Sequence, residues 1–164
     1  MGKIEKLILG IVIIAIAIVG IALVKDDRRN QVIVEEFEEP TWELAAVAGA
    51  PDVDDPALRY GQLEIGEDFA VGLCMDPQVV DGQAKLYFAS MEDNAVWTRI
   101  QLLDESGAIL GESGILKPGE YVESIGLGKV PKKSGLVIAK ILSYEADTYY
   151  SQGTATAQVM LHVE

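Results

Sequence analysis

An unbroken run of apolar residues lies near the N-terminus of the chain. From Leu7 to Val24 the sequence reads LILGIVIIAIAIVGIALV, with no charged residue and no hydrogen-bonding side chain. As an α-helix these eighteen residues would extend about 27 Å, close to the hydrocarbon thickness of a bilayer. No face of such a helix is polar, which excludes an amphipathic helix lying on the membrane surface. The pattern therefore predicts a single transmembrane helix over Leu7 to Val24.

A cleaved signal peptide is the alternative interpretation of this run. Signal peptides share the basic start, but their apolar region is about 7–15 residues long and ends in small residues. The run here is longer and closes on Leu23 and Val24, directly before Lys25. Only Gly20 and Ala22 resemble a cleavage site. We therefore expect an anchor that stays in the membrane, with cleavage as the open alternative.

Basic residues lie on both sides of the apolar run in nearly equal number. Their count therefore does not decide how the helix is oriented in the membrane. Lys3 and Lys6 precede it, and Lys25, Arg28 and Arg29 follow it. Large domains are translocated largely regardless of flanking charge, and a short N-terminal tail with two lysines fits a signal-anchor. We expect a single-pass cell-membrane protein whose large domain is extracytoplasmic.

Beyond residue 61 apolar and polar residues alternate with a period of two, which is typical of β-strands. In residues 154–163, for example, alanine, valine and leucine occupy one face, and threonine, glutamine, methionine and histidine the other. Turn-forming residues separate the strands, and Pro118-Gly119 fits a type II turn. The predicted fold is all-β, an antiparallel immunoglobulin-like sandwich of about seven strands. Strands are predicted at residues 69–75, 84–90, 96–103, 108–110, 121–127, 136–143 and 154–163.

The region between the apolar run and the strands is strongly acidic. Residues 25–60 contain ten acidic and four basic residues, together with three prolines. Like charges repel and prolines interrupt regular structure, so we expect a flexible acidic linker here. Within it, WELAAVA (residues 42–48) could form a short helix or add a strand to the domain. The predicted organisation is a tail and transmembrane helix at 1–24, a linker at 25–60 and a β-sandwich at 61–164.

Composition narrows the function classes. The 164 residues are 49% hydrophobic and carry a net charge of −13, which fits one globular domain and argues against a nucleic-acid partner. A single cysteine, Cys74, excludes an internal disulfide and a thiolate zinc cluster. A single histidine, His162, is too few for a blue-copper site, and no serine lies in a G-x-S-x-G motif. We expect no enzyme activity, cofactor or metal.

One long stretch carries a resemblance to a family. LLDESGAILGESGILKPGEYVESIGL (102–127), then VPKKSGLVIAKILSY (130–144) and the closing strand to Val163, resembles small membrane-anchored surface proteins of Gram-positive gut bacteria. The resemblance covers residues 65–164 and includes the apolar N-terminal helix and polar linker. It implies an extracytoplasmic β-sandwich of undefined activity. The inserted Pro131-Lys132-Lys133 departs from the family pattern before the next strand.

Three tyrosines mark a possible recognition loop. Tyr144, Tyr149 and Tyr150 surround the connection EADTYYSQG (145–153), and exposed tyrosines offer rigid amphipathic contact area. Alternatively, one of them closes the sandwich edge through its hydroxyl group, as in a tyrosine corner. Trp97 is expected in the core or half-buried. The only basic grouping in the domain comprises Lys117, Lys129, Lys132 and Lys133, and we expect it at one end of the sandwich.

These features together favour a non-enzymatic surface protein. The first hypothesis is a membrane-anchored binding or adhesion module whose ligand is an unknown protein or glycan. The alternative is a structural subunit of a membrane-associated complex or filament.

Overall fold

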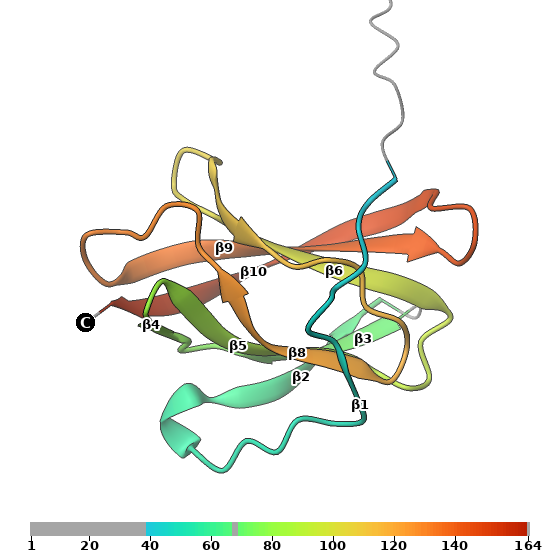
Figure 1. Cartoon of the computed structure of the whole chain (residues 1–164), viewed down its shortest axis with the longest axis horizontal. Helices are drawn as coiled ribbons and strands as arrows, with labels where there is room; N and C mark the ends of the chain where they lie inside the picture. The colour runs from blue at the N-terminus through green and yellow to red at the C-terminus, as the bar shows by residue number, and fades with distance from the viewer. Residues whose placement is uncertain (1–38, 67–68, 164) are drawn as a thin grey trace, which may run out of the picture. The chain divides into compact units, whose positions relative to one another are not determined.

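The chain from Glu39 onward folds as an all-β domain, which confirms the predicted class. The computed structural model describes residues 39–66 and 69–163. In this part of the chain there are ten strands and one short 3-10 helix (Figure 1). They run in the order β1 (Val47–Ala48), η2 (Pro56–Leu58), β2 (Tyr60–Ile65), β3 (Phe69–Cys74), β4 (Gln78–Val80), β5 (Gln83–Ser90), β6 (Val96–Leu103), β7 (Ile109–Glu112), β8 (Glu120–Gly126), β9 (Gly135–Glu145) and β10 (Ser151–Val163).

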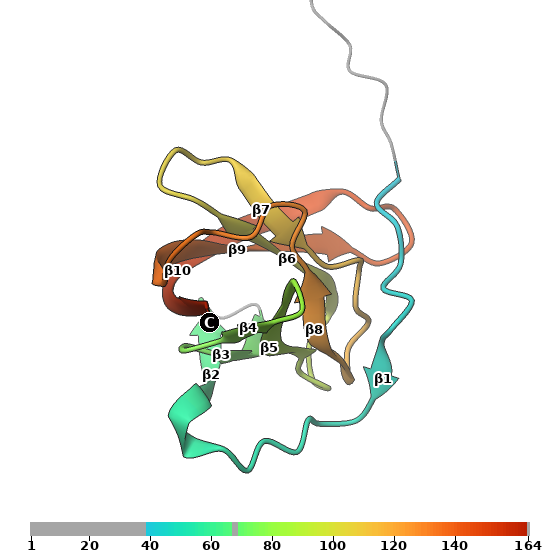
Figure 2. The ribbon, with the colours of Figure 1, turned by 60° about the vertical axis from the view of Figure 1, so that its left-hand side comes forward.

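The strands form a curled sheet whose two halves face each other (Figure 2). One half contains β2, β3, β5, β8 and β1, and the other contains β10, β9, β6 and β7. β4 joins them, because it pairs antiparallel with β5 and parallel with β10. The arrangement is sandwich-like, and the immunoglobulin-like topology stays a prediction.

The parallel pair corrects the expectation of a purely antiparallel sheet. The last residues of β10 run past β9 and cross to the other half, where His162 pairs with Gln78. The backbone N–H of Met160 donates to Met75 at 2.8 Å, and that of His162 donates to Pro77 at 2.9 Å. Alternation within a strand predicts its faces, but it carries no information about which distant strand will pair with its end.

The hydrophobic core lies between the two halves of the sheet. The predicted faces of the last strand are confirmed, since Val159 and Leu161 are buried while Thr154 and Thr156 are exposed. Leu and Ile side chains of β6 and β9 meet Phe88 and Leu86 of β5 in this core. The fully buried large side chains are Phe88, Leu73, Leu86, Ile100, Leu102, Ile115, Leu116, Ile141, Leu161, Val71, Val122 and Val159.

Residues 39–60 are part of the compact domain, which starts at Glu39 rather than at the expected boundary of 61. β1 pairs with β8 through Val47–Tyr121 and Ala48–Glu120, so the last two residues of WELAAVA form a strand. At the other end of this segment, the N–H of Asp76 donates to the carbonyl of Leu58 at 3.2 Å. Such long-range pairing outweighs the charge and proline content that predicted a linker.

The predicted membrane span, Leu7 to Val24, lies outside the described residues. Among residues 39–66 and 69–163, no helix has the length and apolar character needed to cross a bilayer.

Cys74 is packed as a small apolar side chain. It is fully buried at the end of β3. Desolvation by burial, and secondarily the nearby charge of Asp55, raise the pKa of its thiol to about 12.

We expect Cys74 to be alkylated slowly in the native protein. At pH 8 iodoacetamide should react at least roughly a hundredfold more slowly with the folded chain than with the chain in guanidinium chloride, because little thiolate forms and the sulfur is shielded. Mass spectrometry of timed samples measures the two rates. Equal rates would mean that the end of β3 is open to solvent.

Asp76 ties the end of β3 to its neighbours and should make stability depend on acid pH. Arg59 donates to its carboxylate, and His162 Nε2 lies 3.5 Å from the second oxygen. The hydrogen bond from Arg59 is the main cause that holds the pKa of Asp76 below its ordinary value, against an opposing effect of burial. A lowered folded-state pKa contributes stability above the ordinary carboxyl pKa, and this stability is lost as the pH falls through the folded-state pKa.

We therefore expect the free energy of unfolding to fall as the pH drops below about 4, where an unperturbed aspartate takes up its proton. The fall should be shallower in Asp76→Asn and in Arg59→Gln, because neither variant retains the charged pair. Urea unfolding across acid pH measures it. A wild-type slope in both variants would contradict the assignment to Asp76.

Candidate functional site

Three aromatic side chains from three separate segments meet at the start of β6. We call Trp42, Trp97 and Tyr149 the aromatic cluster. The ring centroids of Trp42 and Trp97 are 4.7 Å apart in an edge-to-face arrangement. Those of Trp97 and Tyr149 are 5.3 Å apart, and those of Trp42 and Tyr149 are 6.3 Å apart. Edge-to-face contacts at these separations are the favoured geometry of aromatic pairs, so the cluster is a rigid unit.

Trp42 reaches the cluster because the segment before β1 is hydrogen-bonded to the connection between β7 and β8. The N–H of Ile115 donates to Thr41 at 2.8 Å, and the N–H of Glu43 donates to Ile115 at 3.0 Å. The Glu43 carboxylate also accepts from the N–H of Gly114 at 2.8 Å. These bonds flank Trp42 on both sides and place its ring over β6.

Tyr149 reaches the cluster through a tight connection between β9 and β10. The N–H of Glu145 donates to Tyr150 at 2.8 Å, and that of Tyr149 donates to Glu145 at 3.2 Å. Within the connection Asp147 and Tyr149 have φ values of 67° and 58°, in the left-handed region that most residues avoid. A tyrosine in this conformation costs energy, and such positions concentrate at binding and catalytic sites.

The aromatic cluster is partly open to solvent and carries a positive group. Trp42 is 37% exposed, and the Lys117 ammonium lies 4.9 Å from the centroid of its ring. At that distance the ammonium is attracted by the electron-rich face of the indole. The surface therefore combines flat apolar rings with one cation.

The predicted tyrosines have three different environments. Tyr144 is buried and lies opposite Trp97 in the β6–β9 pairing. Tyr149 belongs to the aromatic cluster, while Tyr150 is 70% exposed beside it. Trp97 is half-buried, as expected. Trp42 was missed as a site residue because it lay in the predicted linker, and the only signal for it was the apolar pattern of WELAAVA.

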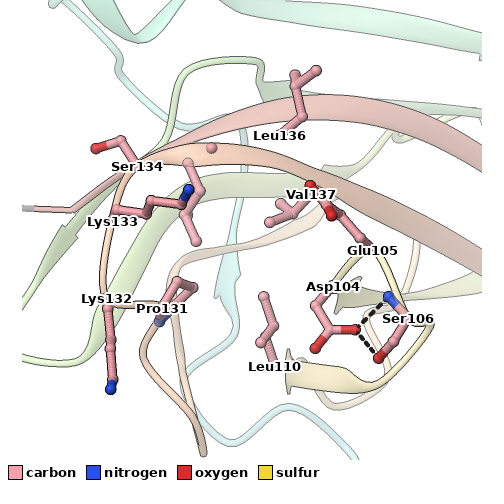
Figure 3. Close-up of a pocket in the computed structure, with 12 residues that line it drawn as sticks. Asp104, Glu105, Ser106, Leu110, Pro131, Lys132, Lys133, Ser134, Leu136 and Val137 are labelled. Carbon is pink, nitrogen blue, oxygen red and sulfur yellow. Dashed lines mark hydrogen bonds between the residues drawn. The ribbon is translucent and has the colours of Figure 1, made fainter.

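A hollow lies at the other end of β6, about 25 Å from the aromatic cluster along this eight-residue strand. This end pocket has a volume of about 650 Å³ and lies between the β6–β7 and β8–β9 connections (Figure 3). Its floor is apolar, formed by Leu110, Val137 and Leu161. Its rim carries charged and hydroxyl side chains, namely Asp104, Glu105, Ser106, Lys132, Lys133 and Ser134.

Asp104 organises one wall of the end pocket. One of its carboxylate oxygens accepts from the Ser106 hydroxyl at 2.6 Å, the Ser106 N–H at 2.9 Å and the Ala108 N–H at 3.0 Å. The bond from the Ser106 hydroxyl is the main cause that lowers the pKa of Asp104. Its other oxygen is 4.0 Å from the Lys129 ammonium. Asp104 therefore holds the β6–β7 turn in place.

The lysines that the sequence grouped together are divided between the two ends of β6. Lys117 lies over Trp42, whereas Lys132 and Lys133 line the end pocket. β8 runs between Lys117 and the other lysines, so residues that are close in sequence lie far apart in the fold.

The described residues contain no cluster of histidine, cysteine or acidic side chains that could hold a metal ion. His162 is on the polar face of β10 beside Asp76, and Cys74 is buried.

Comparison with known proteins shows no family for this chain. No family model matches the chain, and no curated protein matches it. The structure is similar to the crystal structure of CopC from Methylosinus trichosporium OB3b, with 16% sequence identity over 55% of this chain and 84% of that one. The TM-score of 0.32 is too low for this similarity to carry any argument.

Proposed function

We propose that this chain is a single-pass membrane-anchored surface protein that presents its β-domain outside the cell as a non-enzymatic binding or adhesion module. The aromatic cluster is its binding surface, and the ligand is a protein or a glycan. The observation that carries the proposal is the convergence of Trp42, Trp97 and Tyr149 on one partly exposed surface.

The energetic argument rests on preorganisation. Tryptophan and tyrosine dominate the binding energy of protein interfaces because each buries a large rigid area. Here the rings already pack against one another, and hydrogen bonds on both sides of Trp42 hold its backbone. Little conformational entropy would therefore be lost when a ligand binds to this surface.

The sequence supports the proposed location. The apolar run from Leu7 to Val24 has the length of a bilayer span, and the resemblance to membrane-anchored surface proteins implies the same placement. Protease added to intact cells should remove the β-domain while the anchor stays in the membrane fraction. Digestion only after lysis would place the domain inside and overturn the proposal.

Adhesion to immobilised mucin, which offers both glycan and polypeptide, tests the binding surface. Cells that display the full chain should adhere, and Trp42→Ala should weaken adhesion about tenfold or more, as truncation of a central aromatic does. Leu44→Ala is the matched control, since Leu44 is 98% exposed in the same segment. Equal adhesion of the Trp42 and Leu44 variants would exclude the aromatic cluster as the adhesive surface.

One observation favours the second candidate function, a structural subunit of a membrane-associated assembly. Apolar side chains lie in register on the outer face of β7, β6 and β9, where Ile109 pairs with Leu103 and Leu103 with Ile138. Ile109 is 51% exposed and Leu136 is 52% exposed. Sedimentation of the full chain in detergent distinguishes the two candidates, because a subunit should form oligomers that Ile109→Lys disrupts.

A further inference from the structure

The end pocket is a second candidate binding site, separate from the aromatic cluster. Its volume of about 650 Å³ is within the range of sites for small ligands. The apolar floor of Leu110, Val137 and Leu161 would contact the body of a ligand. The rim determines which charges that ligand must carry.

Three of the six polar side chains on the rim already have partners within the protein. Asp104 accepts three hydrogen bonds, one of them from the Ser106 hydroxyl. The Ser134 hydroxyl accepts from the N–H of Val163 at 2.9 Å. Within residues 39–66 and 69–163, no hydrogen bond or ion pair engages the side chains of Glu105, Lys132 and Lys133. These three are the groups left for a ligand.

Two of these three side chains face the pocket from opposite sides. Figure 3 shows the Lys133 ammonium turned inward over the floor, the Glu105 carboxylate beside Val137 on the opposite side, and Lys132 pointing away. The pocket thus presents a positive group, an apolar floor and a negative group in sequence. A simple anion would satisfy only Lys133, and a simple cation only Glu105.

We propose that the end pocket binds a small zwitterion with an apolar body, of which a short apolar peptide with free termini is the simplest example. The ligand carboxylate pairs with Lys133, its ammonium pairs with Glu105, and its side chains lie on the floor. Binding at this site goes beyond the proposed adhesion through the aromatic cluster.

Three matched peptides test the proposal by titration calorimetry on the full chain in phosphatidylcholine nanodiscs. They are Leu-Leu with free termini, N-acetyl-Leu-Leu and Leu-Leu amide. Leu-Leu should bind in a saturable manner, and each blocked peptide should bind about two- to fivefold more weakly, as expected for loss of one exposed ion pair. Absence of saturable binding by Leu-Leu, or a blocked peptide that binds equally well, overturns the proposal.

Variants that remove one charge from the pocket test which residue binds each end of the ligand. Lys133→Gln should weaken Leu-Leu about two- to fivefold and leave Leu-Leu amide unchanged, whereas Glu105→Gln should weaken Leu-Leu and leave N-acetyl-Leu-Leu unchanged. Lys85→Gln, on β5 and away from the pocket, is the matched control. Variants that bind all three peptides like the wild type overturn the assignment. Trp42→Ala should leave Leu-Leu binding unchanged. The peptide titrations therefore test the end pocket independently of the adhesion assay, which tests the aromatic cluster.

Discussion

Gly114→Ala is expected to displace residues 41–48 from the domain and to dismantle the aromatic cluster. A β-carbon at position 114 would overlap the backbone N and Cα of Glu43 and would lie 2.5 Å from the carbonyl carbon of Trp42. These are backbone atoms, so only a shift of the whole segment can relieve the clash. The shift would break the three hydrogen bonds that join Thr41 and Glu43 to Gly114 and Ile115.

Loss of these three bonds should lower the free energy of unfolding by about 3 kcal/mol, at about 1 kcal/mol each. Urea unfolding measures this loss, and a red shift of tryptophan emission reports the exposure of Trp42. Adhesion should be lost together with the cluster. Gly61→Ala is the matched control, because a β-carbon there meets no atom within 4 Å. Native emission from the Gly114 variant would contradict the close approach of the two segments.

Gly111→Ala should destabilise the place where the curled sheet closes. Gly111 and Leu127 form a bridge between the chain at β7 and the residue after β8. A β-carbon at position 111 would overlap the Gly126 carbonyl oxygen and lie 2.9 Å from Leu127 Cδ2. Overpacking of this kind typically costs about 1–3 kcal/mol, and a clash with backbone belongs at the upper end.

The reciprocal variant Gly126→Ala is the control for this contact. A β-carbon there would be 3.6 Å from the Gln83 side chain, an ordinary van der Waals distance, so stability should change by less than about 0.5 kcal/mol. Urea midpoints with an unchanged m-value measure both effects. Similar midpoints for the two variants would show that β7 and β8 do not approach closely.

The predicted strand bounds agree with the structure where apolar and polar residues alternate strongly. The prediction for 96–103 coincides with β6, and 69–75 exceeds β3 by one residue. Alternation is a local property of the pleated backbone, so a single stretch of sequence is enough to reveal it. β1 and β4 have two and three residues, too few to alternate, and they exist only through their pairing partners.

The candidate site was predicted in part. Tyr149 was named in the predicted recognition loop, whereas Trp97 was expected in the core or half-buried and was not named as a site residue. Trp42 was assigned to a linker because acidic residues and prolines surround it, and nothing local reports the bonds from Gly114 and Ile115 that hold it. The end pocket was not foreseen, because Glu105 and Lys133 belong to connections that meet only after β6, β7 and β9 have paired.

The sequence alone determined the all-β class, most strand positions and the buried face of β10, because the alternation of side chains is a local property of each strand. Tertiary structure decided where the domain begins, which strands join the two halves, and which aromatic and charged side chains meet. Those outcomes depend on contacts between residues far apart in the chain. The free energies of these contacts come from burial and hydrogen bonding across the fold. A short stretch of sequence contains no information about them.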